Sequence, residues 1–247
     1  MTGKPRPLAI FNAGPFKGAP DQLYRHYGEQ PDLFGARLGL LPGAIVGVDV
    51  QHLAVLPPAS EFSGVIVSGS PAMVTERLPW AERAAAWIAA SHGRVPMLGV
   101  CFGHQLVAHA LGGQVIDNPA GSEYGTVEVE TLADAAGDPL IGDAPRRFLA
   151  QAAHSQSVAV LPSGAVALAR NGHGLQAARY GRMTWGVQFH PEFDAAISDM
   201  LLTDYGDYLR KRSLDPEALR LALQKSPAAH AVLARFGALV ESGLVAH

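Results

Sequence analysis

Cysteine is almost absent from this sequence, since Cys101 is the only one among 247 residues. Internal disulfides are therefore excluded, which fits a reducing compartment. No stretch approaches the roughly 18 consecutive apolar residues that a membrane-spanning helix needs, and residues 1–7 contain no apolar segment long enough for a secretion signal. We therefore expect a soluble cytoplasmic protein with no membrane partner.

A strong excess of charge is also missing. The chain has 19 Lys and Arg against 22 Asp and Glu, and its formal net charge is −3. The one basic run, residues 210–212, is typical of a helix end, where cations interact favourably with the helix dipole. We therefore expect no nucleic-acid partner. His104 and His109 are five residues apart and do not share the helix face that a zinc pair needs, so we expect neither a metal nor a cofactor.

The single cysteine lies at a predicted strand-to-helix turn. Residues 96–100 are an apolar run typical of a buried strand, and residues 105–111 repeat apolar residues at helical spacing. Gly99 and Gly103 flank Cys101 in a G-x-C-x-G pattern, which permits a sharp turn that lifts the sulfur above the sheet edge. Backbone N–H groups at the helix start favour the reactive thiolate. A lone cysteine is usually an inert core residue, but this setting favours a nucleophile.

A second segment, Phe189-His190-Pro191-Glu192, supplies the partners that a thiol nucleophile needs. A predicted strand ends at His190, and Glu192 follows two positions later, so both side chains can point to one side. A nucleophile requires a base, and the base requires a group that fixes its tautomer and stabilises its cation. A lone histidine at a strand end is more often structural, but together with Cys101 the pair indicates catalysis.

Three motifs between residues 6 and 200 carry a resemblance to a known family. They are G-V-C-F-G-H-Q, G-V-Q-F-H-P-E and V-S-G-S-P, and with them the chain resembles the class I glutamine amidotransferases. The resemblance implies that Cys101 is the nucleophile, His190 its base and Glu192 the orienting group. It further implies an oxyanion hole made by the backbone N–H groups of Gly69 and Phe102. Oriented backbone amides suit this task because they place donors without adding charge.

The resemblance also implies a set of substrate-binding residues: Gln105, His154, Ser155 and Gln156. Gln156 stands where the family has an acid, and a neutral amide accepts from an ammonium without the charge pairing. Glu123 and Tyr124 resemble a G-x-E-Y-G loop near the same pocket, although an ordinary turn uses the same glycines. The expected substrate is a small γ-glutamyl molecule, and the change at position 156 argues against free glutamine.

The order of short apolar segments and helical segments predicts an α/β fold. We expect an open, mostly parallel sheet flanked by helices, with the site at the carboxyl ends of the strands. An antiparallel hairpin region follows, and a C-terminal helical appendage ends the chain. The expected strands are residues 7–11, 45–50, 65–67, 96–100, 126–130, 158–160, 165–169 and 175–180, and the first clear helix is 80–90.

The last part of the chain is predicted to be helical. We expect an amidotransferase-like domain at residues 1–200 and a helical extension of it at 201–247. The helices are expected at residues 194–212, from Asp215-Pro216 and from Pro227 onward. This tail either covers the site or a partner surface, or it extends the core.

The motifs leave three functions open. The first is a stand-alone hydrolase that cleaves the γ-amide of glutamine or of a γ-glutamyl compound through a glutamyl thioester. The second is a glutaminase subunit that supplies ammonia to a separate synthase, and the third is a catalytically idle scaffold. The complete Cys101–His190–Glu192 set argues against the scaffold. The lack of a synthetase domain and the neutral Gln156 favour the stand-alone hydrolase, while the oligomeric state stays open.

Overall fold

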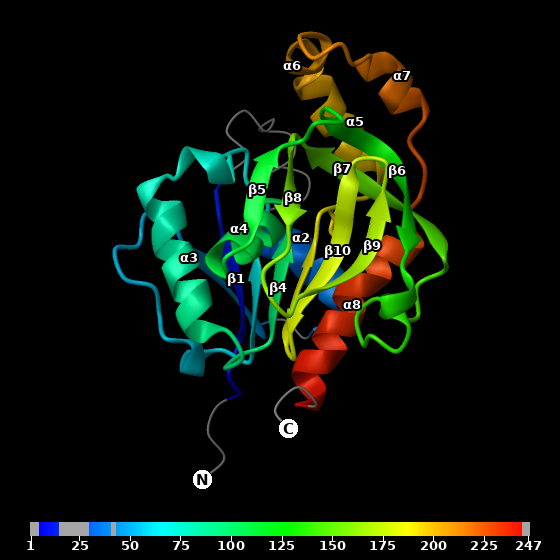
Figure 1. The fold of residues 1–247 in the computed structure, drawn as a ribbon. Coiled ribbons are helices and arrows are strands. Elements are labelled where there is room, and N and C mark those ends of the chain that lie inside the picture. The colour runs from blue at the N-terminus through cyan, green and yellow to red at the C-terminus, as the bar shows by residue number, and fades with distance from the viewer. Residues whose placement is uncertain (1–4, 15–29, 41–42, 244–247) are drawn as a thin grey trace.

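The computed structural model describes residues 5–14, 30–40 and 43–243. In this part of the chain a nine-stranded sheet forms the centre, in the order β2-β1-β3-β4-β11-β10-β9-β6-β7 (Figure 1). Its strands are β1 (Leu8–Asn12), β2 (Ile45–Asp49), β3 (Gly64–Val67), β4 (Met97–Val100), β6 (Glu123–Thr131), β7 (Arg147–His154), β9 (Val166–Asn171), β10 (Gly174–Gly181) and β11 (Thr184–Val187). A second, two-stranded sheet pairs β5 (Gln114–Asp117) with β8 (Gln156–Val160).

The first half of the large sheet is parallel, as predicted. Strands β2, β1, β3, β4 and β11 all pair in parallel. Strands β3, β4 and β11 are buried along their whole length. A parallel sheet is covered by helices on both faces, and this explains why these segments read as continuous apolar runs. Their carboxyl ends lie along one edge, where the sequence places Cys101 and His190.

The second half is antiparallel and continues the same sheet. Strand β10 pairs antiparallel with β11 and β9, and β6 pairs antiparallel with β9 and β7. The predicted hairpin region is therefore confirmed. The prediction of a loop around Glu123 and Tyr124 is wrong, because both residues lie at the start of β6. They pair there with His154 and Ala153 of β7, a strand for which the sequence analysis made no prediction.

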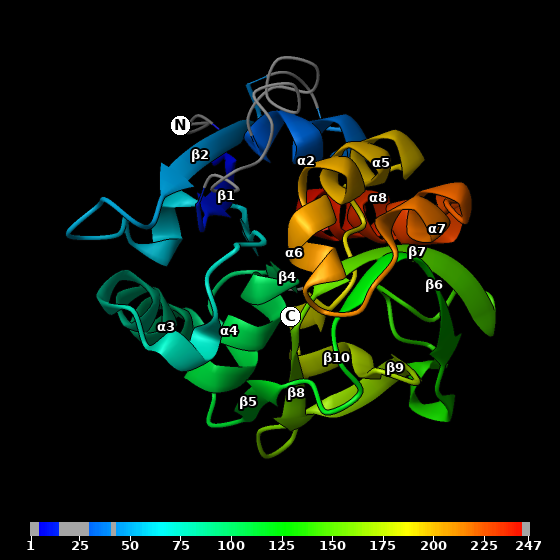
Figure 2. The same cartoon turned by 90° about the horizontal axis from the view of Figure 1, so that it is seen from above.

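Helices cover both faces of the sheet, as Figure 2 shows from above. The helices are α2 (Gln30–Leu38), α3 (Pro79–Ser91), α4 (Phe102–Ala110), α5 (Ala195–Asp204), α6 (Gly206–Arg210), α7 (Pro216–Leu221) and α8 (Pro227–Ser242), with short 3-10 turns η1 (Ala59–Glu61), η2 (Val74–Glu76) and η3 (Ala133–Ala135). Alternate residues of β1 enter different cores: Leu8 packs with α2 and α8, whereas Phe11 packs with α3 and α4. This alternation follows the two-residue period of a strand.

Helices α5 to α8 form the C-terminal part of the described chain. Helix α8 belongs to the core, since Val232, Leu233 and Phe236 are fully buried. The prediction of a single helix at 194–212 is wrong, because the helix is interrupted at Tyr205, between α5 and α6. Gly206 follows the break, and glycine is the poorest helix former after proline. The division of the chain at residue 200 stays a prediction.

The starts of the last two helices follow their sequence signals. Asp215 caps α7 by accepting hydrogen bonds from the N–H groups of Glu217 and Ala218, and Pro227 is the first residue of α8. No helix within the described ranges is both long and apolar enough to cross a bilayer.

Candidate active site

Cys101 occupies the strained turn that the sequence predicts. It lies between the end of β4 and the start of α4 with φ 52° and ψ −107°, and it is 5% exposed. A non-glycine residue with positive φ persists only where its surroundings enforce it. A Cβ on Gly103 would overlap the backbone oxygen of Val67, and a Cβ on Gly99 would overlap the backbone of Gly103. The two glycines are therefore required for α4 to pack against the strands.

His190 follows β11 and pairs with Glu192. The His190 Nδ1 atom lies 2.7 Å from the Glu192 Oε1 atom, and the two residues are 1% and 3% exposed. One face of the imidazole stacks on Phe193, with ring centroids 4.1 Å apart and planes within 4°. A Cβ on Gly69 would lie 2.9 Å from the His190 Cε1 atom. The ring is thus stacked on Phe193 and lies close to Gly69. Glu192 occupies Nδ1, which leaves Nε2 for another partner.

The electrostatics of His190 favour its protonated form. Burial, the largest effect, lowers the pKa of His190, but the Glu192 carboxylate and the Cys101 side chain outweigh it and raise the pKa to about 10. A carboxylate within a few ångströms favours the charged imidazole. The Cys101 thiol also lies 3.7 Å from the backbone oxygen of Ala153. The structure thus brings the three residues of the predicted triad together.

Both residues expected to form the oxyanion hole lie close to Cys101. Phe102 is the first residue of α4, where backbone N–H groups lack an acceptor within the helix. Gly69 lies in the loop after β3, close enough that a Cβ there would be 3.7 Å from the Cys101 Cβ. The buried Ser68 hydroxyl fixes this loop, because it accepts from Ala13 N and donates to Gly69 O.

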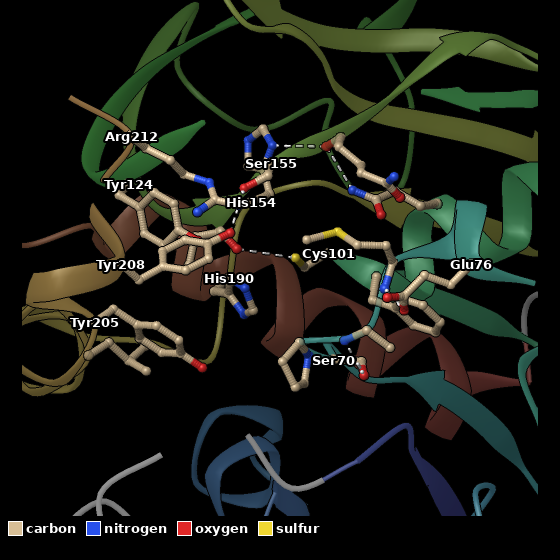
Figure 3. Close-up of a pocket in the computed structure, with 18 residues that line it drawn as sticks. Ser70, Glu76, Cys101, Tyr124, His154, Ser155, His190, Tyr205, Tyr208 and Arg212 are labelled. Carbon is tan, nitrogen blue, oxygen red and sulfur yellow. Dashed lines mark hydrogen bonds between the residues drawn. The ribbon is translucent and has the colours of Figure 1, made fainter. Parts of the chain in front are cut away.

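A cavity of about 390 Å³ opens beside Cys101 and His190. Such a volume falls in the range of small-molecule sites, roughly 300–1,000 Å³. Figure 3 shows several of its side chains. Apart from Cys101 and His190, its lining residues are Ser70, Pro71, Ala72, Met73, Glu76, Phe102, Gln105, Tyr124, Ala153, His154, Ser155, Gln156, Leu201, Tyr205, Tyr208 and Arg212. The sequence analysis did not place the last four in the site. The signal for Leu201, Tyr205 and Tyr208 was a set of apolar and aromatic residues on one predicted helix face, whereas Arg212 belonged to the basic run expected at a helix end.

The four expected substrate-binding residues all line this cavity, although protein partners already hold parts of them. The Gln105 Nε2 atom donates to Gln156 O at 2.8 Å and to Gln188 Oε1 at 3.0 Å. The Ser155 Oγ atom lies 3.3 Å from the Tyr208 Oη atom, which links the residue after β7 to α6. Their roles toward a substrate stay predictions.

Gln156 is held by an acid from another element. Its Nε2 atom donates to Thr75 Oγ1 at 2.6 Å and to Asp117 Oδ1 at 2.9 Å. Its Oε1 atom is buried and has no hydrogen-bond partner among the described residues. An acid at position 156 would face the Asp117 carboxylate, and like charges at this distance repel. The neutral amide therefore fits the surroundings that this chain provides.

A second buried carboxylate–imidazole pair supports the end of β7. The Glu123 Oε2 atom lies 2.9 Å from His154 Nε2, and Asn171 and Gln176 donate to the same carboxylate. Burial raises the pKa of Glu123, but the hydrogen bond and charge of His154 outweigh it and lower the pKa overall. His154 Nδ1 also lies 3.0 Å from Gln156 O. This network fixes the strand end whose backbone contacts Cys101.

Two histidines, His104 and His109, lie in the helix that follows Cys101. No group of three or more His, Cys, Asp and Glu side chains in the described ranges is arranged to hold a metal ion. His104, beside the turn, instead has its Nδ1 atom 3.1 Å from the Tyr180 hydroxyl. Burial lowers the pKa of His104 to about 3, so this imidazole is neutral.

The family assignment follows from a match over most of the chain. The model of the family described as Glutamine amidotransferase class-I matches residues 42–204. The chain belongs to this family. The match contains Gly69, Cys101, His190 and Glu192, and it ends just before Tyr205.

Curated relatives carry two kinds of name. The chain is 33% identical over 182 residues to a subunit of the glutamine-hydrolyzing GMP synthase of Methanopyrus kandleri, covering 73% of this chain and 85% of that protein. It is 34% identical over 144 residues to a gamma-glutamyl-L-1-hydroxyisopropylamide hydrolase of a Pseudomonas species, covering 55% and 48%. With the GMP synthase of Thermomicrobium roseum it shares 41% identity over 52% of this chain and only 23% of that protein.

Solved structures share the fold over nearly the whole chain. A glutamine amidotransferase from Thermotoga maritima superimposes with a TM-score of 0.70 and 22% identity, covering 96% of this chain and 98% of that one. A glutamine amidotransferase from Methylobacillus flagellatus gives a TM-score of 0.64 and 23% identity, with 94% of each chain covered. At these identities the likeness concerns the fold.

Proposed function

We propose that this protein is a stand-alone hydrolase that cleaves the γ-amide bond of a γ-glutamyl compound. The observation that carries the proposal is Cys101 on its positive-φ turn beside the buried His190–Glu192 pair, in a cavity of substrate size. These are the parts of an activated thiol nucleophile.

The proposed reaction has two stages. The Cys101 thiolate attacks the γ-carbonyl carbon, and the N–H groups of Gly69 and Phe102 stabilise the oxyanion. Protonated His190 donates its proton to the leaving nitrogen, the C–N bond breaks, and a glutamyl thioester remains. Neutral His190 then removes a proton from water, whose oxygen attacks the thioester. The C–S bond of the thioester breaks, glutamate leaves, and the Cys101 thiolate and protonated His190 are restored, while Glu192 stabilises the imidazolium.

The wall of the cavity supports the stand-alone function. Tyr205, Tyr208 and Arg212 line the cavity from the same chain that carries Cys101. In a glutaminase that depends on a synthase, we expect the partner to complete the site. Here the chain itself supplies these three lining residues. The likeness to the Pseudomonas hydrolase agrees with a larger leaving amine.

The alternative is a glutaminase subunit that delivers ammonia to a separate synthase. It is supported by the match to the Methanopyrus kandleri protein, since this chain covers 85% of it. Both functions use the same triad, so the fold and the catalytic residues do not distinguish ammonia from a larger amine as the leaving group.

The test measures glutamate released by the purified protein alone from glutamine and from γ-glutamyl dipeptides. We expect turnover of at least one γ-glutamyl compound without a partner, and none by the Cys101→Ala variant. A glutamine-analogue electrophile should label the wild type stoichiometrically, and Cys101 is the only possible thiol target. Activity that requires a co-purifying synthase would favour the ammonia-supplying function. A folded protein that is neither labelled nor active would favour the idle scaffold.

A further inference from the structure

The cavity beside Cys101 carries two charged groups of opposite sign. Among the described residues that line it, Glu76 is the one acid and Arg212 is the one arginine or lysine. In Figure 3 Glu76 lies on one side of Cys101, and Arg212 lies on the other side with Tyr124 and Tyr208. The cavity is therefore bipolar, with the nucleophile between its two ends.

Arg212 is placed to bind an anion. Its Cζ atom lies 3.6 Å from the centre of the Tyr208 ring, so the guanidinium stacks on the ring. A stacked guanidinium keeps its N–H donors in its own plane, where a carboxylate can accept two of them. Within the described chain no carboxylate forms an ion pair with Arg212, whereas the nearby Arg210 pairs with Asp207 and Glu217.

The chemistry of a γ-glutamyl substrate indicates that Glu76 and Arg212 bind different parts of it. The α-carbon of a γ-glutamyl group carries its ammonium and its carboxylate together, so the groups that bind them must be close neighbours. Glu76 and Arg212 lie on opposite sides of Cys101 and therefore serve different parts of the substrate. Position 156 is a neutral glutamine, so Glu76 is the acid in the lining that can take the ammonium, while its Oε2 atom accepts from Met73 N at 3.0 Å. Arg212 then faces the amine part that leaves.

We propose that Arg212 binds a carboxylate on the leaving amine, so that the preferred substrates are γ-glutamyl amino acids and short γ-glutamyl peptides. This inference rests on the proposed γ-glutamyl hydrolase function. Tyr205 and Tyr208 supply an aromatic surface for the side chain of the amine part. Both tyrosines and Arg212 lie beyond residue 204, where the family match ends. The preference is thus a property of this chain's own C-terminal segment.

The test compares two substrates that differ in one group. γ-Glutamylglycine and γ-glutamylethylamide have leaving amines of similar size, but only the first carries a carboxylate. For Arg212→Gln we expect kcat/KM to fall about tenfold with γ-glutamylglycine, as suits one charge-assisted contact at an exposed site. With γ-glutamylethylamide it should stay within twofold of the wild type. Arg210→Gln is the matched control and should change neither value, since Arg210 does not line the cavity.

Three results would overturn the proposal. The first is an Arg212→Gln variant whose ratio of kcat/KM between the two substrates equals that of the wild type. The second is an Arg212→Gln variant that loses both activities equally. The third is an Arg210→Gln variant that changes the ratio in the same way as Arg212→Gln. Binding of both compounds to Cys101→Ala, with and without Arg212→Gln, is measured by calorimetry in parallel. If the wild type hydrolyses neither these two compounds nor any other γ-glutamyl compound, the proposed function fails, and calorimetry still decides whether Arg212 recognises the carboxylate.

Discussion

Replacing Gly69 with alanine tests whether His190 is held in a single position. Gly69 is outside the set of positive-φ glycines, so alanine fits its backbone and the effect comes from contacts alone. The new Cβ would lie 2.9 Å from the His190 Cε1 atom, closer than real Cβ contacts. Phe193 stacks on the ring with centroids 4.1 Å apart, which limits how far the ring can move away from the new Cβ.

The size of the effect follows from this geometry. Relief of the contact requires the ring or the loop to move by roughly 0.5–1 Å to reach ordinary van der Waals distance. A misplacement of about 1 Å in a catalytic group costs on the order of 10²-fold in rate. We therefore expect kcat of Gly69→Ala to fall by about 10- to 100-fold. The loop also carries one of the proposed oxyanion donors, so its movement acts in the same direction.

The assay combines turnover of a γ-glutamyl substrate, the rate of Cys101 labelling and thermal unfolding. Gly172→Ala is the matched control, because a Cβ there meets no atom within 4 Å and its φ is ordinary. Both variants should unfold within a few degrees of the wild type, and only Gly69→Ala should lose activity. Wild-type turnover in Gly69→Ala would refute the idea that this loop pins the imidazole. A loss of activity that simply tracks a loss of folding would refute it as well.

Two further predictions concern stability. Gly103→Ala should lower the free energy of unfolding by about 3 kcal/mol or more, because its Cβ meets the backbone oxygen of Val67, which only a shift of α4 relieves; an unchanged value in urea unfolding would contradict this. The pKa of His190 is raised from 6.5 to about 10, so the folded state holds an extra proton between these values. The stability advantage of the wild type over His190→Gln, a few kcal/mol, should be complete below pH 6.5 and vanish toward pH 10. A difference independent of pH would contradict the Glu192 pairing.

The turn at Cys101 was predictable because its determinants are local. Gly99 and Gly103 stand two residues from the cysteine in sequence, and each is required by a contact within that same turn or with the adjacent strand. The parallel strands were predictable for a similar reason, since burial on both faces leaves a continuous apolar run. The pairing of His190 with Glu192 needs only two residues of one short segment.

The rest of the site depends on contacts between distant segments. Nothing near Gln156 in sequence shows that Asp117 and Thr75 hold its amide. In the same way, the pairing of Glu123 with His154 requires the register of β6 against β7. The apolar periodicity of residues 194–212 is that of one helix and does not predict the interruption at Tyr205. Such features arise from tertiary packing, which overrides local propensity.

The proposed specificity depends on residues that follow the break at Tyr205. The helix predicted from the sequence is interrupted at Tyr205, and beyond this point Tyr208 of α6 and Arg212 after α6 line the cavity. These side chains lie just beyond the part of the chain that matches the family, while the proposed nucleophile and base lie inside it. Under the proposed function, the shared segment supplies the chemistry of the γ-amide, and the segment after it supplies the surroundings of the leaving amine. Relatives that differ after the break are therefore expected to differ in the amine they release even where their catalytic motifs are identical.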